Sequence, residues 1–247
     1  MLVLRSLVYN VLFYLNLSIL LLVALATFVL PRWGIIRMAK LWGQTSIWLL
    51  RVVVGTRVEY RGLDRVPAGG LLVASKHQSI FETFTLMAFF ADPAFILKHE
   101  LRWIPVFGWL TVKAGMIPVR RGGSTALSEM NRRAAAEAAS GRQIIIFPEG
   151  TRRPAGAEPA YKLGIAHLYK SLDKPCLPVA LNSGLFWPRR SFIRHPGTIV
   201  IEFLDPIAPG LERDAFLSLL QDRIERATAA LIDEAREGSG YTGPAGI

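Results

Sequence analysis

A long stretch without charge most constrains what this chain can fold into. From Leu7 to Leu30 the sequence holds 24 residues without an Asp, Glu, Lys or Arg, and Arg5 and Arg32 flank it. A helix needs about 20 apolar residues to cross the hydrocarbon core of a bilayer, so this segment is long enough to anchor the chain in a membrane. A cleaved signal peptide is the competing interpretation, because residues 24–26 resemble a cleavage site. Apolar residues continue to Leu30, which favours an uncleaved anchor.

A second apolar stretch, from Trp33 to Val54, differs from the first because it carries cations. Its basic residues and internal tryptophans are Arg37, Lys40, Arg51, Trp42 and Trp48. This composition is typical of a helix that lies in the membrane interface with its cations toward lipid headgroups. If the first helix spans the bilayer, the basic residues after Leu30 place that side in the cytoplasm. A spanning helix and a two-helix hairpin in one leaflet both fit the sequence.

The remainder of the chain alternates short aliphatic runs with helical stretches. The expected strands are Arg57–Tyr60, Gly70–Ser75, Ala94–Leu97, Met116–Val119, Gln143–Phe147, Cys176–Ala180 and Thr198–Phe203. The expected helices are Ser124–Ser140, Ala160–Leu172 and Asp214–Glu237. This alternation predicts an α/β fold with a mostly parallel sheet flanked by helices. We therefore expect a two-helix membrane anchor over residues 1–56, an α/β domain over 57–237 and a flexible tail over 238–247.

The net charge of +10 narrows the class of partner. Residues 1–60 carry +5, residues 61–210 carry +8 and residues 211–247 carry −3. Such an excess of positive charge favours an anionic membrane, an anionic ligand or both as the partner of the protein. Nucleic acid fits poorly beside a bilayer helix. A hydrophobic content of 51% excludes a disordered chain, and the single Cys176 excludes a disulfide framework.

The first candidate for chemistry is the segment Lys76-His77-Gln78-Ser79-Ile80-Phe81-Glu82, directly after an expected strand. Positions five apart lie about 140° apart on a helix, so His77 and Glu82 meet only if His77 precedes the helix and Glu82 lies in its first turn. Glu82 would then hold one imidazole nitrogen while the other accepts a proton from a substrate hydroxyl. Alternatively, Ser79-x-x-Glu82 is a capping box, in which Glu82 only bonds the backbone at the helix start.

The second candidate is the loop Phe147-Pro148-Glu149-Gly150-Thr151-Arg152-Arg153, which follows an aliphatic strand. Open α/β sheets bind ligands at the carboxyl ends of their strands. There Gly150 lets a ligand approach the backbone, Thr151 offers a hydroxyl, and Arg152 offers a guanidinium that matches phosphate oxygens. Glu149 is expected to orient a guanidinium or a substrate hydroxyl. A solvated basic turn is the alternative.

The third candidate is the segment from Gly115 to Gly123, in which Arg120 and Arg121 end another expected strand. Adjacent strand residues point to opposite sides, so only one arginine is expected to face a site. A charged turn before the next helix is the alternative.

Motifs of other enzyme classes are absent from the sequence. The sequence holds no glycine-rich nucleotide loop and no Gly-x-Ser-x-Gly motif. Its other histidines show no metal-ligand spacing, so no metal is expected; they are His99, His167 and His195.

Together these motifs resemble the glycerophospholipid acyltransferase family, most closely its 1-acylglycerol-3-phosphate acyltransferases. His77-x-x-x-x-Glu82 resembles the family's His-x-x-x-x-Asp block, with a carboxylate one methylene longer. Residues 147–152 match its Phe-Pro-Glu-Gly-Thr-Arg block without a change. Residues 115–121 resemble the middle block, although Arg120 stands where the family often has an acid, and Leu177-Pro178-Val179 resembles the last block. Lys98 lies in a segment that fits the region between the first two blocks.

This resemblance implies acyl transfer from acyl-CoA or acyl carrier protein to the sn-2 hydroxyl of lysophosphatidic acid, giving phosphatidic acid. It implies His77 as general base, oriented by Glu82. The acceptor's phosphate and glycerol would be bound by Arg121, Glu149, Gly150, Thr151 and Arg152, with Lys98 and Arg120 as additional candidates. It implies no metal or organic cofactor.

Membrane lipids are expected partners, and a membrane-bound enzyme would face the cytoplasm, at the inner membrane if it is bacterial. Two other functions fit the same residues. One is acyl transfer to another acceptor, such as glycerol 3-phosphate or a lyso-aminolipid. The other is a non-catalytic, membrane-anchored protein that binds anionic lipid.

Overall fold

The sheet at the centre of the molecule has seven strands in the order β1-β7-β6-β2-β5-β3-β4. A computed structural model describes residues 1–120 and 124–238. The strands are β1 (Thr56–Arg61), β2 (Leu71–Ser75), β3 (Pro93–Lys98), β4 (Ile117–Val119), β5 (Gln143–Ile146), β6 (Cys176–Leu181) and β7 (Gly197–Phe203). Within the described residues every neighbouring pair is parallel except β6 and β7. The predicted α/β fold with a mostly parallel sheet is confirmed.

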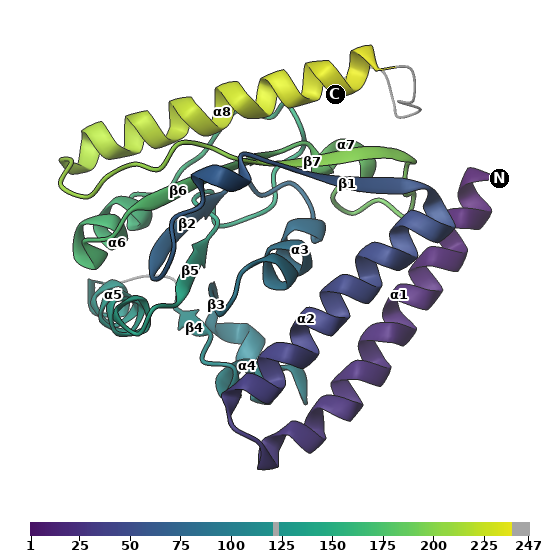
Figure 1. Ribbon diagram of the computed structural model, residues 1–247, viewed down its shortest axis with the longest axis horizontal. Coiled ribbons are helices and arrows are strands. Elements are labelled where there is room, and N and C mark those ends of the chain that lie inside the picture. Colours follow the sequence, from purple (N-terminus) through teal and green to yellow (C-terminus); the bar gives the residue numbers. More distant parts are fainter. Residues whose placement is uncertain (121–123, 239–247) are drawn as a thin grey trace.

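Helices cover both faces of this sheet (Figure 1). Strand β2 has Leu71 and Val73 on one face and Leu72 and Ala74 on the other, and all four side chains are buried. Parallel strands that are covered on both faces need such continuous aliphatic runs, which is why β2 lacks the polar alternation of a half-exposed strand.

One face packs against α5 (Ser124–Ala139), α6 (Gly164–Leu172) and α8 (Arg213–Glu237). The other face packs against α1 (Leu2–Ala24), α3 (Phe81–Phe89) and α7 (Ser183–Phe186). Helix α6 begins four residues later than the sequence predicts. The reason lies in a hydrogen bond from the Lys162 amide to the Pro148 carbonyl, 2.9 Å, which holds this segment as a loop.

The N-terminal segment forms a helical hairpin whose arms lie side by side (Figure 1). Helix α1 continues into the 3-10 turn η1 (Leu25–Val29), and α2 (Arg32–Leu49) continues into the π-helical turn η2 (Leu50–Val54). Residues Leu2–Val29 are long and apolar enough to cross a membrane, by length and composition. Tyr9 and Phe13 of α1 nevertheless lie in the same hydrophobic core as the sheet.

Polar contacts near the start of α1 fix it against the loop after α7. Asn10 donates to the Phe192 carbonyl at 2.9 Å and accepts from Arg194 Nη2, also at 2.9 Å. The Arg194 guanidinium stacks over the Trp187 ring at 4.3 Å, and burial lowers its pKa to about 10. Since a buried cation needs partners, these contacts make the first turns of α1 part of the α/β core.

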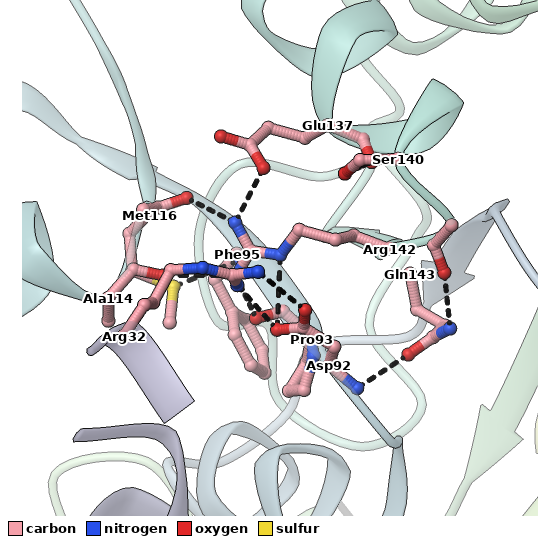
Figure 2. A network of polar contacts seen from close by, with 12 residues as sticks. Arg32, Asp92, Pro93, Phe95, Ala114, Met116, Glu137, Ser140, Arg142 and Gln143 are labelled. Atoms are coloured by element: carbon pink, nitrogen blue, oxygen red, sulfur yellow. Dashed lines mark hydrogen bonds and ion pairs between the residues drawn. The ribbon is translucent and has the colours of Figure 1, made fainter. Parts of the chain in front are cut away.

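A buried arginine fixes the other end of the hairpin (Figure 2). All five N–H donors of Arg142, which directly precedes β5, have an acceptor. These acceptors are the carbonyls of Pro93, Ala114 and Gly115, each at 3.0 Å, Asp92 Oδ1 at 3.2 Å and Glu137 Oε2 at 2.8 Å.

Asp92 links this arginine to Arg32, at the start of α2, through hydrogen bonds of 2.6 and 2.8 Å. Burial acts to raise the pKa of Asp92, but the hydrogen bond from Arg32 and the charges of Arg142 and Arg32 outweigh it and lower that pKa. The hairpin is therefore held at its closed end by ionic contacts and near its start by Asn10.

We expect Arg142→Met to lower the free energy of unfolding by about 3 kcal/mol, because Asp92 and Glu137 lose a charged partner and three carbonyls lose a donor. Chemical denaturation of the full chain in detergent measures this loss. The control is Arg133→Met, whose exposed pair with Glu129 on α5 contributes about 0.5 kcal/mol or less. Equal effects of both substitutions would show that the buried network adds no stability.

Candidate active site

Three loops meet where the neighbouring strands β6, β2 and β5 end. The loop after β2 carries His77, the loop after β5 carries Glu149, and the turn after β6 carries Ser183. Because these strands are parallel, their carboxyl ends lie at one edge of the sheet. The topology thus gathers side chains from three distant parts of the sequence.

Glu82 lies in the first turn of α3 and is fully buried. Its Oε1 accepts hydrogen bonds from the Gln78 and Ser79 amides, both at 2.7 Å, and lies 2.8 Å from His77 Nδ1. Its Oε2 accepts from the Ser183 hydroxyl at 2.8 Å. Four donors satisfy the charge of a carboxylate that has no contact with water.

One oxygen of Glu82 thus makes both contacts that the sequence offered as alternatives. It bonds the backbone before the helix, as in a capping box, and it holds the imidazole. The capping box is incomplete, because Ile80 rather than Ser79 is the N-cap residue. The Ser79 hydroxyl instead accepts from the Phe81 amide at 3.3 Å.

Two contacts fix the His77 ring, one at Nδ1 with Glu82 and one on the face of the ring with Phe147. It stacks on Phe147 with ring centres 3.9 Å apart and planes 13° apart. Since the Glu82 carboxylate only accepts hydrogen bonds, Nδ1 carries the proton of the neutral ring, and Nε2 keeps its lone pair on the opposite edge. The side chain retains 15% exposure, so a ligand can reach it.

A second buried charge cluster lies directly beside His77. The Lys76 ammonium contacts Glu149 Oε1 at 3.2 Å and both oxygens of Glu225 at 2.8 and 2.9 Å. The Tyr161 hydroxyl donates to Glu225 Oε1 at 2.9 Å. Lys76 and Glu149 are each 2% exposed, so this lysine compensates charge that water does not reach.

Glu149 has one oxygen paired with Lys76, whereas its Oε2 is buried and has no hydrogen-bond partner among the described protein atoms. Burial raises the pKa of this carboxyl, and the charge of Lys76 opposes the rise. An unpaired buried acceptor is costly, so Oε2 is suited to receive a donor from a ligand.

The other predicted residues of this loop lie at or near the surface. Gly150 is exposed and has a φ of 64°, in the left-handed region that glycine adopts without a Cβ clash. Thr151 and Arg152 are half-buried, and the Arg152 carbonyl accepts from Arg189 Nη1 at 2.9 Å.

Lys98 and Arg120 lie farther along the same edge, at the carboxyl ends of β3 and β4. Strands are spaced about 4.8 Å apart, so β3 lies about 10 Å and β4 about 14 Å from β2. Both side chains are exposed, and Arg120 Nε lies 3.4 Å from His99 Nε2.

Arg121 and the predicted tail from residue 239 lie outside the described residues. In the described part of the chain, no group of three or more His, Cys, Asp or Glu side chains is placed to hold a metal.

Three residues of the site carry no role that the sequence predicts, namely Lys76, Ser183 and Glu225. Lys76 stands within the first motif, and Ser183 follows an expected strand, so the rule about strand ends would have marked both. Glu225 is 149 positions from Lys76 and lies on a charged helix, where nothing local distinguishes it from a solvated residue.

Known proteins resemble this chain over the segment that holds His77, Glu82 and Glu149. A family model described as "Acyltransferase" matches residues 57–182. The chain is 38% identical over 161 residues to a 1-acyl-sn-glycerol-3-phosphate acyltransferase of Pseudomonas aeruginosa, covering 65% of this chain and 63% of that protein. It is 25% identical over 216 residues to a protein of the same name from Cocos nucifera, covering 83% of this chain and 70% of that one.

The fold is shared with a solved structure, that of the 1-acyl-sn-glycerophosphate (LPA) acyltransferase PlsC from Thermotoga maritima. The TM-score is 0.80 at 22% identity, over 97% of this chain and 100% of that one. The chain spans less than two thirds, 63%, of the length of its Pseudomonas relative. The family match nevertheless covers more than half of this chain and includes His77, Glu82 and the loop at Glu149. The chain belongs to the acyltransferase family.

Proposed function

We propose that this chain transfers a fatty acyl group from acyl-CoA or acyl carrier protein to the sn-2 hydroxyl of lysophosphatidic acid, giving phosphatidic acid. The observation that carries the proposal is the His77 ring, held by a buried Glu82 beside the loop of Glu149 and Arg152. The names of the relatives from Pseudomonas aeruginosa and Cocos nucifera support lysophosphatidic acid as the acceptor.

In this reaction His77 Nε2 takes the proton of the sn-2 hydroxyl as the oxygen attacks the thioester carbonyl. The new carbon–oxygen bond forms, the carbon–sulfur bond breaks, and the departing thiolate receives the proton back from the imidazolium. Glu82 stabilises that imidazolium while it exists. No acyl-enzyme is needed. Ser79 is fully buried with its hydroxyl bonded to the backbone, so it is no nucleophile.

The basic loops of the site hold the acceptor's phosphate in this proposal. The phosphate carries about −1.5 to −2 charge, which suits the paired donors of Arg152 and Arg121. Gly150 and Thr151 let the headgroup approach the backbone, with Lys98 and Arg120 as further cations along the edge. Glu149 Oε2 accepts a hydrogen bond from the glycerol part, which would satisfy its unpaired oxygen.

Lys76 positions this carboxylate rather than touching the substrate. Its ammonium lies between Glu149 and Glu225, and its backbone leads directly into His77. One lysine therefore fixes the spacing between the loop with the base and the loop with the phosphate ligands. Because α8 supplies Glu225, the C-terminal helix supports the site without lining it.

A lyso-aminolipid acceptor is the second candidate, favoured by one relative. The chain is 36% identical over 108 residues to a lyso-ornithine lipid O-acyltransferase of Pseudomonas aeruginosa, covering 43% of this chain and 41% of that protein. An acceptor without phosphate leaves Arg121 and Arg152 without a role, so lysophosphatidic acid is the better fit.

The N-terminal hairpin anchors the chain in one leaflet in this proposal, with the site facing the cytoplasm. Tyr9 and Phe13 pack into the α/β core, whereas the outer side of α1 exposes large apolar side chains, among them Leu4, Val11, Leu15 and Leu22. A helix spanning the bilayer would have to leave that core. A hairpin in one leaflet keeps these contacts and buries the outer side.

The function is tested by thiol release from acyl-CoA and acyl carrier protein with lysophosphatidic acid, glycerol 3-phosphate or lyso-ornithine lipid as acceptor. We expect release with lysophosphatidic acid and a loss of about 10²–10⁴-fold in His77→Ala, the range for removal of a general base. His167→Ala on α6 is the matched control and should keep full activity. Release that prefers lyso-ornithine lipid, or that survives loss of His77, contradicts the proposal.

Glu82→Gln separates catalysis from capping, because the amide oxygen still accepts the two backbone hydrogen bonds while the charge is lost. The Ser183 hydroxyl can rotate to accept from the new amide group. We expect kcat to fall by at least about 10²-fold, since the imidazolium loses its counter-charge, with little change in the unfolding midpoint. Glu82→Asp, which keeps the charge, should retain more activity. Full activity in Glu82→Gln would show that Glu82 only caps the start of α3 and that its charge plays no part in the reaction.

Lys76→Met should lower the free energy of unfolding by about 3 kcal/mol, because Glu149 stays buried without its counter-charge. The loss should shrink as the pH falls, since a carboxyl with a raised pKa becomes neutral in the folded protein first. Adding Glu149→Gln should restore part of the stability. Lys170→Met, which removes an exposed pair with Glu212, is the control. If the double variant Lys76→Met with Glu149→Gln is no more stable than Lys76→Met alone, Lys76 does not compensate the charge of Glu149.

A further inference from the structure

The segment between β3 and β4 carries large apolar side chains into solvent. It consists of the 3-10 turn η4 (His99–Trp103) and the short helix α4 (Phe107–Lys113). The side chains are Trp103, Ile104, Trp109 and Val112, which are 72%, 46%, 56% and 58% exposed. Two tryptophans outside the core, on one short segment of a folded domain, call for a partner that covers them.

The backbone of this segment is constrained to a conformation that presents these residues. Val106 has a φ of 63°, a left-handed value that a β-branched residue rarely adopts. A Cβ at Gly108 would lie 2.0 Å from the Arg102 carbonyl oxygen, so only glycine allows this turn. The Gly108 amide donates to the Ile104 carbonyl at 2.7 Å. Strained turns persist where the surrounding structure holds them, and they concentrate at functional sites.

The inner side of α4 packs against the closed end of the N-terminal hairpin. Leu110 and Ala114 share a hydrophobic cluster with Ala24 and Ile35. Figure 1 shows α4 beside this end of α1 and α2.

A lysine joins α4 to the tip of the hairpin. Lys113 Nζ donates to the carbonyls of Phe28 and Leu30 at 3.1 and 2.7 Å, and it lies 5.5 Å from the Phe28 ring centre. The tip itself is exposed and apolar, with Val29 at 89%. The outer side of α4 therefore lies next to the exposed apolar tip of the hairpin.

We propose that Trp103, Ile104, Trp109 and Val112 form a second membrane-contacting surface, which rests in the headgroup region of the leaflet that holds the hairpin. Tryptophans beside cations are typical of the membrane interface, and Arg102 stacks on the Trp103 ring at 5.2 Å. Continuity with the apolar helix of residues 2–29 favours a lipid surface over a second copy of the chain.

This contact would bring the active-site edge to the lipid. His99, the first residue of η4, lies beside Arg120 and contacts the Trp103 ring with centres 6.4 Å apart. A lysolipid leaving the leaflet along this segment would meet the cations at the ends of β3 and β4 first. This consequence rests on the proposed acyl transfer, whereas the membrane contact rests only on the proposed one-leaflet position of the hairpin.

The test is Val112→Cys in the full chain, labelled with nitrobenzoxadiazole and reconstituted into vesicles of phosphatidylethanolamine and phosphatidylglycerol. Labelling is selective, because the single native Cys176 is fully buried. We expect a blue shift of the emission and quenching by nitroxide lipids labelled near the headgroup. Leu22→Cys on α1 is the positive control, and Ala230→Cys on α8, across the sheet, is the negative control.

A Val112 label that behaves like the Ala230 label while the Leu22 label shifts overturns the proposal. So does a shift that disappears when the protein is diluted into excess lipid, since a second copy then covers the surface. These outcomes do not depend on acyl transfer, so they stand even if the proposed function fails.

A paired variant, Trp103→Ser with Trp109→Ser, tests the consequence for the site. We expect a several-fold higher apparent KM for lysophosphatidic acid presented in vesicles, with an unchanged KM for the acyl donor. An unchanged KM for the vesicle-bound acceptor contradicts delivery along this segment. Normal kcat at saturating acceptor in detergent serves as the check that the variant is folded.

Discussion

The Glu82 carboxylate is the group on which the candidate active-site edge of this fold depends. A fully buried negative charge is tolerated only where donors replace water, and its donors come from the turn after β2 and from Ser183 after β6. Those same bonds fix the distance between two strand ends that lie far apart in the sequence. The His77 ring then has one position in which Nδ1 meets this carboxylate and its face meets Phe147. The same hydrogen bonds thus stabilise this edge of the sheet and align the proposed base.

The adjacent residues Lys76 and His77 serve separate charge networks because their side chains diverge at the end of β2. The histidine pairs with Glu82 toward α3, and the lysine pairs with Glu149 and Glu225 toward α8. Each buried carboxylate has its own partner, so the two networks do not compete for a proton or a cation. This division lets one loop carry both the proposed base and the residue that positions the proposed acceptor site.

Local patterns were sufficient for the parts of the site that are close in sequence. The contact of His77 and Glu82 follows from a five-residue spacing at a strand-to-helix turn, and the burial of β2 follows from its aliphatic run. Glu225 gave no signal, because a glutamate on an amphipathic helix is solvated in most proteins and only the packing of α8 brings it to Lys76. The exposure of the η4–α4 tryptophans gave no signal either, since Trp103 and Trp109 are residue types that usually lie in the core, and only the structure shows that both side chains face solvent.

The hairpin and the α/β unit are joined at both ends of the hairpin by polar contacts. Near its start Asn10 bonds Arg194, and at its closed end Arg32 pairs with Asp92, which Arg142 holds in turn. A flexible linker would let an anchored domain sample many distances from the bilayer. Here the ionic contacts and the shared core remove that freedom, so in the proposed one-leaflet arrangement the depth of the hairpin sets the height of the candidate active-site edge above the bilayer. Under the proposed function, the fold rather than a flexible tether then sets the distance between the lipid acceptor and His77.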